Sequence, residues 1–477
     1  MSLVCFVRVC LTPGVDEREL AELRTALLDF ADEMFAGFAR ADQRANRLRY
    51  LRGLILDGQR KSMQPMAERL GVDHQQLQQF MTSSTWDYVA VRRRLAAQII
   101  DLIEPVAWVL DDTGFAKDGD ASPGVARQYS GTLGKVGNCQ IAVSVHAATT
   151  RASGVLDWRL YLGASWDEDC LPAATTATTD TGADIAARQA ARRKVSRAMT
   201  SGRTVSAATL AAAGTGGISA AERAELSQRI SARRDRAKIP ATEGHRPKWE
   251  LALEMIDELL GWGHTPPAVV GDAGYGQAEF RTALSERDLT YMLATTPAAT
   301  AYRADTALVP GTGRRKPHYE GKASTLKDLA LHAGRNRLRH ITWRQGTKRT
   351  PTNPDADMSG HFTALRVRPA ATAIPRDENG VLPEVWLMIE WPPDKDEPTD
   401  YWLSNLPADT PLKTLVRLAK IRWRIEHDYR ELKTGLGLDH FEGRTFTGWH
   451  RHATLVSAAQ LFLTTLRLHT PKADGQT

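Results

Sequence analysis

Two short apolar runs in this chain each end in an aspartate, and they constrain the fold more than any other feature. The run VAWVL (106–110) is followed by Asp111, and PAVVG (267–271) is followed by Asp272. Short runs of this kind are typical of buried strands. Ligands in open α/β sheets lie at the carboxyl ends of strands, so we expect both acids where buried strands emerge. Because an aspartate after a strand is also common in turns and helix caps, neither residue alone establishes a site.

A third acidic residue, Glu426, lies in the helical stretch KIRWRIEHDYRELK. Arg422, Glu426 and Lys433 are separated by four and then seven residues, which at ~3.6 residues per turn places them on one helix face. The two cations would hold the carboxylate ionised and could bind DNA phosphates. An ordinary surface helix with ion pairs has similar spacing. This helix therefore indicates a functional site only in combination with the two aspartates.

Acids delivered from two strand ends and a helix can converge to hold divalent metal ions. Mg²⁺ prefers oxygen ligands, and two ions ~3.5–4 Å apart can activate an attacking oxygen and stabilise a leaving one. The sequence therefore predicts metal-dependent chemistry, with Asp111, Asp272 and Glu426 as catalytic residues and metal ligands. Asp112 is the rival of Asp111. Glu431 is a weaker rival of Glu426, because it lacks the Arg and Lys spacing.

The composition fits a soluble, intracellular protein of several domains. The 477 residues include 62 Lys and Arg against 56 Asp and Glu, a formal net charge of +6 that is consistent with a polyanionic partner. The four cysteines have no metal-binding spacing and are expected to be reduced thiols of a cytoplasmic protein. No apolar run approaches the ~18 residues of a membrane span, so we expect no membrane partner.

The chain divides into four parts by pattern. In the first, MQPMAERLGVDHQQLQQFM (63–81) has the layout of a helix-turn-helix with its turn at Gly71, and its glutamines could offer amides to base edges. A plain helical hairpin has the same layout. The expected parts are a helical, DNA-binding N-terminal domain (1–104), the first part of an α/β core (105–299) with a basic insertion (172–245), a β-rich insertion (300–408), and a helical part that carries Glu426 (409–470).

Four segments, with the order of the three acids, resemble the DDE transposases of bacterial insertion sequences. The segments are DDTGFAKDG, GVARQYSGTLGKVGNCQIAVSVH, VVGDAGYG and RWRIEHDYRELKTGLGLDHFEGR. They are similar to the actinobacterial-type members of the branch with a Y-x2-R-x3-E-x6-K signature, over roughly 40–465 apart from the basic insertion. Arg422, Glu426 and Lys433 fill the last three places of that signature. The Tyr place is Ala419, and Tyr429 is the alternative source of a tyrosine.

The resemblance implies a ribonuclease-H-like catalytic core that binds two Mg²⁺ ions, with Mn²⁺ as an alternative. It implies cleavage of transposon ends by water and joining of the freed 3′ hydroxyl to target DNA, by a homodimer assembled on paired double-stranded ends. The family pattern of an Asp, one residue, then Thr or Ser favours Asp111 over Asp112. Two other functions remain open: a non-catalytic DNA-binding regulator derived from a transposase, and a metal-dependent nuclease without strand transfer.

Further residues are expected near DNA. Trp343, Trp386, Trp391 and Trp402 include candidates for base stacking, although most are expected in the core. His450 and His452 are expected to be satisfied histidines of a helix rather than metal ligands. The expected DNA contacts are Arg422 and Lys433 beside Glu426, Lys117 and Gln128 near the first acid, and Arg60 and Lys61 beside the helix-turn-helix.

Overall fold

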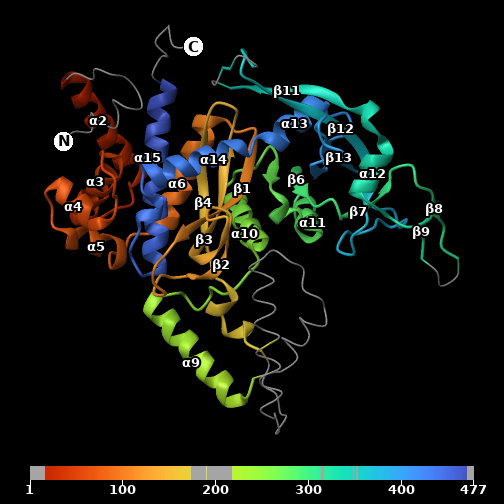
Figure 1. Cartoon of the computed structure of the whole chain (residues 1–477). Coiled ribbons are helices and arrows are strands. Elements are labelled where there is room, and N and C mark those ends of the chain that lie inside the picture. Colours follow the sequence, from red (N-terminus) through yellow and green to blue (C-terminus); the bar gives the residue numbers. More distant parts are fainter. Residues whose placement is uncertain are drawn as a thin grey trace.

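The chain is built around one large mixed sheet, so its α/β class is confirmed. The computed structural model describes residues 17–172, 190, 218–312, 316–346, 349–350 and 353–469. Twelve strands follow the order β10-β7-β12-β13-β14-β6-β5-β1-β3-β2, with β4 beside β3 and β11 beside β12, and β8 and β9 form a separate pair (Figure 1). The strands are β1 (Ala107–Ala116), β2 (Ala126–Ser130), β3 (Lys135–Ala148), β4 (Ser153–Tyr161), β5 (Val269–Gly271), β6 (Tyr291–Thr295), β7 (Thr300–Arg303), β8 (Leu308–Val309), β9 (His318–Tyr319), β10 (Ser324–Thr325), β11 (Arg339–Gln345), β12 (Asp357–Pro369), β13 (Val385–Glu390) and β14 (Asp400–Ser404).

Five strands at the centre of the sheet position the acids. β1, β3 and β4 pair antiparallel in chain order, whereas β5 pairs parallel with β1 and with β6. The register sets Leu110 opposite Gly271, so Asp272 follows β5 next to Asp111. Successive side chains of a strand point to opposite faces, which sends Asp111 and Asp112 to different sides of the sheet.

Helices cover both faces of the central strands. On one face, α10 (Lys248–Gly261) packs on β3 and β4. On the other, Val109 of β1 shares a core with residues of α13 (Leu412–Lys420) and α14 (Trp423–Arg430). Short helical segments complete this part: η1 (Ala164–Trp166), η2 (Glu168–Cys170), η3 (Ala273–Tyr275), α11 (Ala278–Glu286), α12 (Leu326–Ala333), η4 (Arg335–Arg337), the π-helical turn η5 (Glu431–Gly435) and η6 (Leu438–His440).

The N-terminal part of the chain is helical, as predicted. Gly71 ends α4 in the left-handed conformation at φ 65°, and the Asp73 side chain caps α5 by accepting from the Gln75 backbone N–H at 2.9 Å. This is the helix, tight turn and second helix that the sequence predicts. Figure 1 shows the first four of these helices gathered beside α15 (Phe446–His469), whereas the fifth, α6, packs directly on β4. The helices are α2 (Glu17–Met34), α3 (Ala41–Ile55), α4 (Met63–Leu70), α5 (His74–Thr82) and α6 (Tyr88–Ile103).

The β-rich segment between the second and third acids continues the central sheet. The segment contains β11 to β14 and is therefore rich in strands, as predicted. β14 pairs antiparallel with β6 from Tyr401 opposite Thr295 to Ser404 opposite Met292. The segment therefore adds its strands to the edge of the core.

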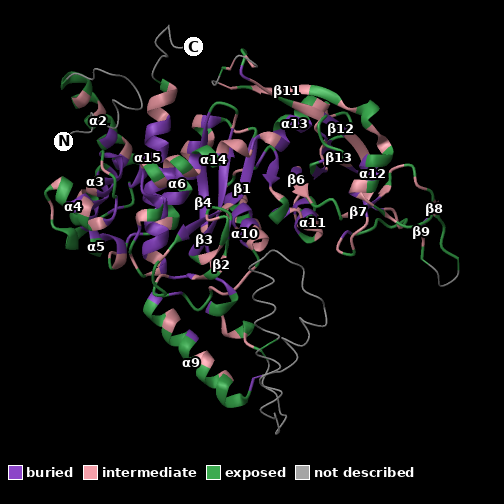
Figure 2. Cartoon of the chain, viewed as in Figure 1, coloured by how far each residue is buried: buried purple, intermediate pink, exposed green. Residues whose placement is uncertain are grey.

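Part of the basic insertion is helical. Ser219 accepts from the Glu222 backbone N–H at 3.1 Å and so begins α9 (Ala220–Ala237). Figure 1 shows α9 extending away from the sheet, and Figure 2 shows it mostly exposed. The C-terminal end of α9 packs against η1, where the Arg233 guanidinium stacks 3.6 Å from the Trp166 ring centroid. Residues 173–189 and 191–217 lie outside the described part of the chain.

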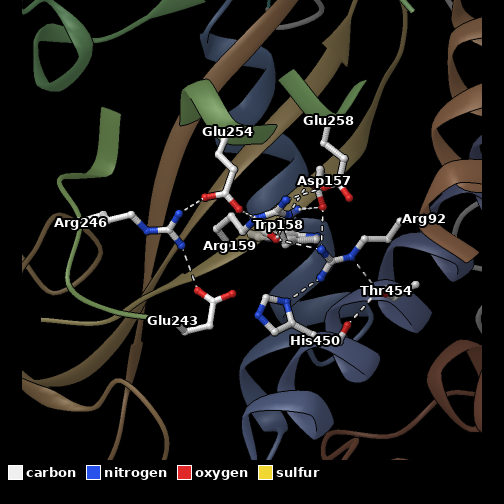
Figure 3. Close-up of polar contacts among 10 residues, drawn as sticks. All are labelled: Arg92, Asp157, Trp158, Arg159, Glu243, Arg246, Glu254, Glu258, His450 and Thr454. Carbon is white, nitrogen blue, oxygen red and sulfur yellow. Dashed lines mark hydrogen bonds and ion pairs between the residues drawn. The ribbon is translucent and has the colours of Figure 1, made fainter. Parts of the chain in front are cut away.

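A buried network of charged groups joins α6, β4 and α15 (Figure 3). Arg92 donates to Asp157 at 2.7 Å, to Thr454 at 3.1 Å and to Nδ1 of His450 at 2.6 Å. Arg159 donates to the other Asp157 oxygen at 2.6 Å. The buried carboxylate of Asp157 is thus paired with two guanidinium groups, the condition under which buried charges are tolerated.

α15 is the central helix of the molecule and is buried along most of its length (Figure 2). His452 accepts from the Tyr50 hydroxyl at 2.9 Å and donates to the Gly437 carbonyl at 3.0 Å. His450 and His452 are therefore hydrogen-bonded histidines of a helix, as predicted. In the described ranges, no helix is long and apolar enough to cross a membrane.

The buried His452 makes stability depend on pH. Burial lowers the pKa of His452 from 6.5 to about 3, so below pH 6.5 the unfolded chain binds a proton that the folded chain does not. The free energy of unfolding should therefore fall as pH falls from 6.5 towards 3, with up to about 1.4 kcal/mol per pH unit coming from this residue. Urea titrations at pH 7, 6 and 5 should show a shallower fall for His452→Gln. Equal slopes in the two proteins would contradict the assignment.

Candidate functional site

A cleft of about 570 Å³ lies where β1, the end of β5 and α14 meet, and it contains all three predicted acids. Its lining holds four carboxylates and four cationic side chains. The lining residues are Asp111, Asp112, Thr113, Tyr129, Gly131, Thr132, Lys248, Asp272, Arg422, Glu426, Tyr429, Arg430, Lys433 and Thr434.

Asp111 is the most enclosed acid of the cleft, with its side chain 9% exposed. It lies inside β1, and its carboxylate accepts from Arg422 at 3.0 Å. Burial raises the pKa of Asp111 to about 6; Arg422 opposes the rise, and the charges of Asp272 and Asp112 add to it. The carboxylate therefore stands in surroundings where additional positive charge would stabilise its ionised form.

Asp112 pairs with a different partner on the other face of the strand. Its carboxylate accepts from Lys248, the first residue of α10, at 2.8 Å. The pleat of β1 thus gives the two neighbouring acids different partners, Arg422 for Asp111 and Lys248 for Asp112, while both line the cleft.

Asp272 is held by a tight loop. Its side chain accepts from the Gly274 backbone N–H at 2.8 Å. Burial raises the pKa of Asp272, against the charge of Arg422 and this hydrogen bond. A Cβ on Gly276 would come within 2.3 Å of the Ala294 carbonyl oxygen on β6. The glycines of VVGDAGYG therefore let the loop fold closely against the neighbouring strand.

Glu426 enters the cleft from α14 and is the most exposed of the three, with its side chain 65% exposed. Arg422 lies 3.5 Å from Glu426 while also holding Asp111, so one guanidinium links β1 to α14. Lys433 lies in the π-helical turn after α14 and donates to the Gly114 carbonyl at 2.8 Å. Burial lowers the pKa of Lys433 to about 8. Glu431 pairs instead with Arg467 of α15 and does not line the cleft.

The other predicted DNA contacts lie outside the cleft lining. Lys117 donates to the Phe441 carbonyl at 2.8 Å, and Gln128 donates to the Cys139 carbonyl at 2.9 Å. Arg60 is exposed but paired with Glu442. Lys61 is 2% exposed, and its ammonium donates to carbonyls at the end of α3. The expectation that Lys61 contacts DNA is therefore wrong for this conformation, because the helix end encloses its charge.

The tryptophans of the β-rich segment are mostly internal, as expected. Trp391 and Trp402 are buried, at 4% and 6% exposed. Trp343 packs against the core beneath α13. Trp386 donates from its indole N–H to the Pro407 carbonyl at 2.9 Å.

Two cations and one aromatic residue of the cleft lining were not predicted from the sequence. Arg430 follows Glu426 by four residues, so helical spacing could have indicated it. Lys248 begins an ordinary amphipathic helix, and no local pattern marks it. Tyr129 lies on β2, a strand that was not predicted, and its 63% exposure at the cleft is a property of the fold.

The fold and the cleft define a mixed α/β protein in which acidic side chains from two parallel neighbouring strands and one helix line one cleft together with cationic groups. The chain belongs to the DDE superfamily endonuclease family, whose model matches residues 33–229 and 195–350.

Two similar proteins are transposases by their descriptions. The chain is 37% identical over 97 residues to a probable transposase for insertion sequence element IS701 from Microchaete diplosiphon. This match spans 20% of the chain and 26% of the relative. The structure of a piggyBac transposase synaptic complex with hairpin DNA aligns with 99% of this chain and 83% of that one, at 9% identity. Its TM-score of 0.30 is too low to bear on the fold.

The glycine after the Asp272 loop provides a test of this geometry. Gly276→Ala should destabilise the chain by about 1–3 kcal/mol, because the new methyl group would overlap a backbone carbonyl that cannot move easily. Gly119→Ala is the matched control, since a Cβ there meets nothing within 4 Å. Urea denaturation of both variants measures the effect. Equal stability of the two would show that the loop does not lie as described.

Proposed function

We propose that this chain is a DNA transposase that cleaves transposon ends and joins them to target DNA, with Asp111, Asp272 and Glu426 as its catalytic acids. One observation carries the proposal: these three carboxylates line one cleft in a member of the DDE endonuclease family. The transposase description of the IS701 relative supports it, although the match spans only about a quarter of that protein.

The order of the central strands supports a ribonuclease-H-like core. β4, β3 and β1 are antiparallel, and β5 and β6 follow parallel to β1. This arrangement places the end of β5 beside the middle of β1 and so brings acids from distant parts of the chain together. α14 then supplies the third acid from above the same face.

The cleft fits divalent metal ions by the chemistry of its donors. Asp111 and Asp272 offer carboxylate oxygens at neighbouring strands, and burial raises the pKa of both. In the part of the chain that the structure describes, no three His, Cys, Asp or Glu side chains are grouped closely enough to hold a metal ion. Arg422 instead binds Asp111 and lies close to Glu426. Bound Mg²⁺ would supply the positive charge that activates an attacking oxygen, and Arg422 would have to release Asp111.

The cations of the cleft are suited to DNA backbone phosphates. Arg422 can bind two phosphate oxygens at once, and Lys433 is fixed beside β1 by the Gly114 carbonyl. Together they would orient the scissile phosphate over Asp111 and Asp272. The released guanidinium of Arg422 would exchange a carboxylate partner for a phosphate.

The helix-turn-helix is the candidate for recognition of the DNA ends. Gln75, Gln76, Gln78 and Gln79 of α5 are all exposed. Glutamine amides can pair with adenine edges in the major groove. We therefore propose that α5 reads the ends and that the cleft cleaves them.

The acids can be tested by isosteric replacement. Asp272→Asn and Glu426→Gln should each abolish Mg²⁺-dependent cleavage of a plasmid that carries the DNA flanking the gene, because an amide is a poor metal ligand. DNA affinity should stay close to that of the wild type. Asp305→Asn is the control, since Asp305 is an exposed acid that does not line the cleft. Undiminished cleavage by either cleft variant would refute the proposal.

The neighbouring acids of β1 should differ sharply. Asp111→Asn should abolish cleavage, because Asp111 faces α14. Asp112→Asn should retain cleavage and lose at most about 1 kcal/mol of stability, because it breaks a partly exposed ion pair with Lys248. Parallel cleavage assays and urea titrations measure both. If only Asp112→Asn lost cleavage, Asp112 and not Asp111 would be the catalytic acid of β1.

A further inference from the structure

A chain of buried polar side chains runs from beneath α14 to the cleft, and neither the proposed metal ligands nor the DNA contacts use it. Ser144 and His146 lie on β3 on the same face as Asp111, whose register partner is Ser144. Both are 0% exposed. Asp428 and Tyr429 of α14 lie over them, and Tyr429 also lines the cleft.

The hydrogen bonds of this chain are continuous, and Ser144 Oγ also lies 3.5 Å from the Asp111 backbone carbonyl. His146 Nδ1 lies 3.1 Å from Asp428 Oδ2, and His146 Nε2 lies 2.9 Å from Ser144 Oγ. Ser144 Oγ lies 2.7 Å from the Tyr429 hydroxyl. The far end is closed, because Ser153 donates to Asp428 Oδ1 at 2.6 Å and accepts from Arg424 at 3.0 Å.

The direction of donation follows from the chemistry of each group. The Asp428 carboxylate accepts from Ser153 on one oxygen and lies against His146 Nδ1 with the other, so we assign the His146 proton to Nδ1, which leaves Nε2 as an acceptor. Ser144 then donates to His146, whose Nε2 at 2.9 Å is nearer than the Asp111 carbonyl at 3.5 Å, and accepts from Tyr429. The Tyr429 oxygen keeps a free lone pair in this arrangement, and the Tyr429 side chain belongs to the cleft lining. The chain is therefore oriented to take up a proton from the cleft.

We propose that Tyr429, Ser144 and His146 form a proton relay that removes the proton from the nucleophile during DNA cleavage. The inference rests on the proposed function. As the attacking water oxygen bonds to phosphorus and the P–O3′ bond breaks, the water proton passes to the Tyr429 oxygen. The Tyr429 proton moves to Ser144, and the Ser144 proton moves to His146 Nε2. The leaving 3′ oxygen takes a proton from solvent, and His146 later returns its proton through the relay.

The surroundings of His146 suit a transient positive charge. Asp428 contacts it from α14, with Arg424 one residue further along the hydrogen-bond chain. The rings of Trp158 and Tyr429 pack beside it, at 6.2 and 5.4 Å between centroids. A carboxylate partner would stabilise the imidazolium, as in other base–acid pairs. Tyr429 in turn is the relay's contact with the cleft, one helical turn beyond Glu426.

Tyr429→Phe is the sharpest test, because it removes the hydroxyl and keeps the ring. Single-turnover cleavage of the plasmid with flanking DNA, in Mg²⁺, should slow by on the order of 10²-fold with DNA affinity unchanged. The wild-type rate should depend non-linearly on the D₂O fraction, because several protons move together, and this curvature should be lost in the variant. Ser144→Ala should reproduce both effects. Tyr50→Phe is the matched control, since it removes a buried hydroxyl from a histidine outside the cleft.

The outcomes separate the relay from the function on which it rests. Slower cleavage by Tyr429→Phe and Ser144→Ala, with unchanged affinity and lost curvature, supports the relay. Wild-type rates in Tyr429→Phe, or a loss of rate matched by a loss of affinity, overturn the relay while leaving the transposase proposal intact. A wild-type protein that cleaves no DNA, or an Asp272→Asn variant that cleaves normally, overturns both.

Discussion

The parallel pairing of β5 with β1 is the constraint on which the site depends. β5 has three residues, all buried, and its register sets Gly271 opposite Leu110. Asp272 therefore follows the strand beside Asp111, although the two residues are 161 positions apart in the chain. The close approach of Tyr275 and Leu293 to Gly271, each 3.1 Å from the position of a Cβ, explains why a glycine precedes the acid. Without this pairing, α14 would have no pair of acids to face.

Two sets of polar contacts hold α14 over that pair, one partly exposed in the cleft and one buried beneath the helix. Arg422 joins Asp111 to Glu426 at the surface of the cleft, and Asp428 anchors the underside of the helix to His146 and Ser153. Burying so many polar groups is unfavourable unless each is hydrogen-bonded, and here the partners come from different elements. The same contacts that position Glu426 also provide the proposed path for a proton. In this account, structural support and proton transfer are properties of one hydrogen-bonded chain.

The sequence predicted strands before the two aspartates and a helical N-terminus, and the three acids that it singled out line one cleft. Only Asp272 follows its strand as predicted, because β1 continues past Asp111 to Ala116. The sequence offers no physical reason to prefer Asp111 over Asp112, because it does not reveal which face of β1 packs against α14. It also placed Lys61 at the surface, whereas the end of α3 encloses it. In the sequence, His146 and Ser144 are isolated polar residues within an apolar strand, and no local pattern marks them as functional. Their connection to Tyr429 exists only once α14 packs on β3.

The central claim is that Asp111 and Asp272 hold a divalent cation once DNA occupies the cleft. Anomalous diffraction from crystals of the chain with its DNA ends and Mn²⁺ would locate such an ion directly. The account predicts a peak between the Asp111 and Asp272 carboxylates, with Arg422 turned from Asp111 to a phosphate. An empty position there, with Arg422 still bound to Asp111 and manganese held elsewhere, would contradict it.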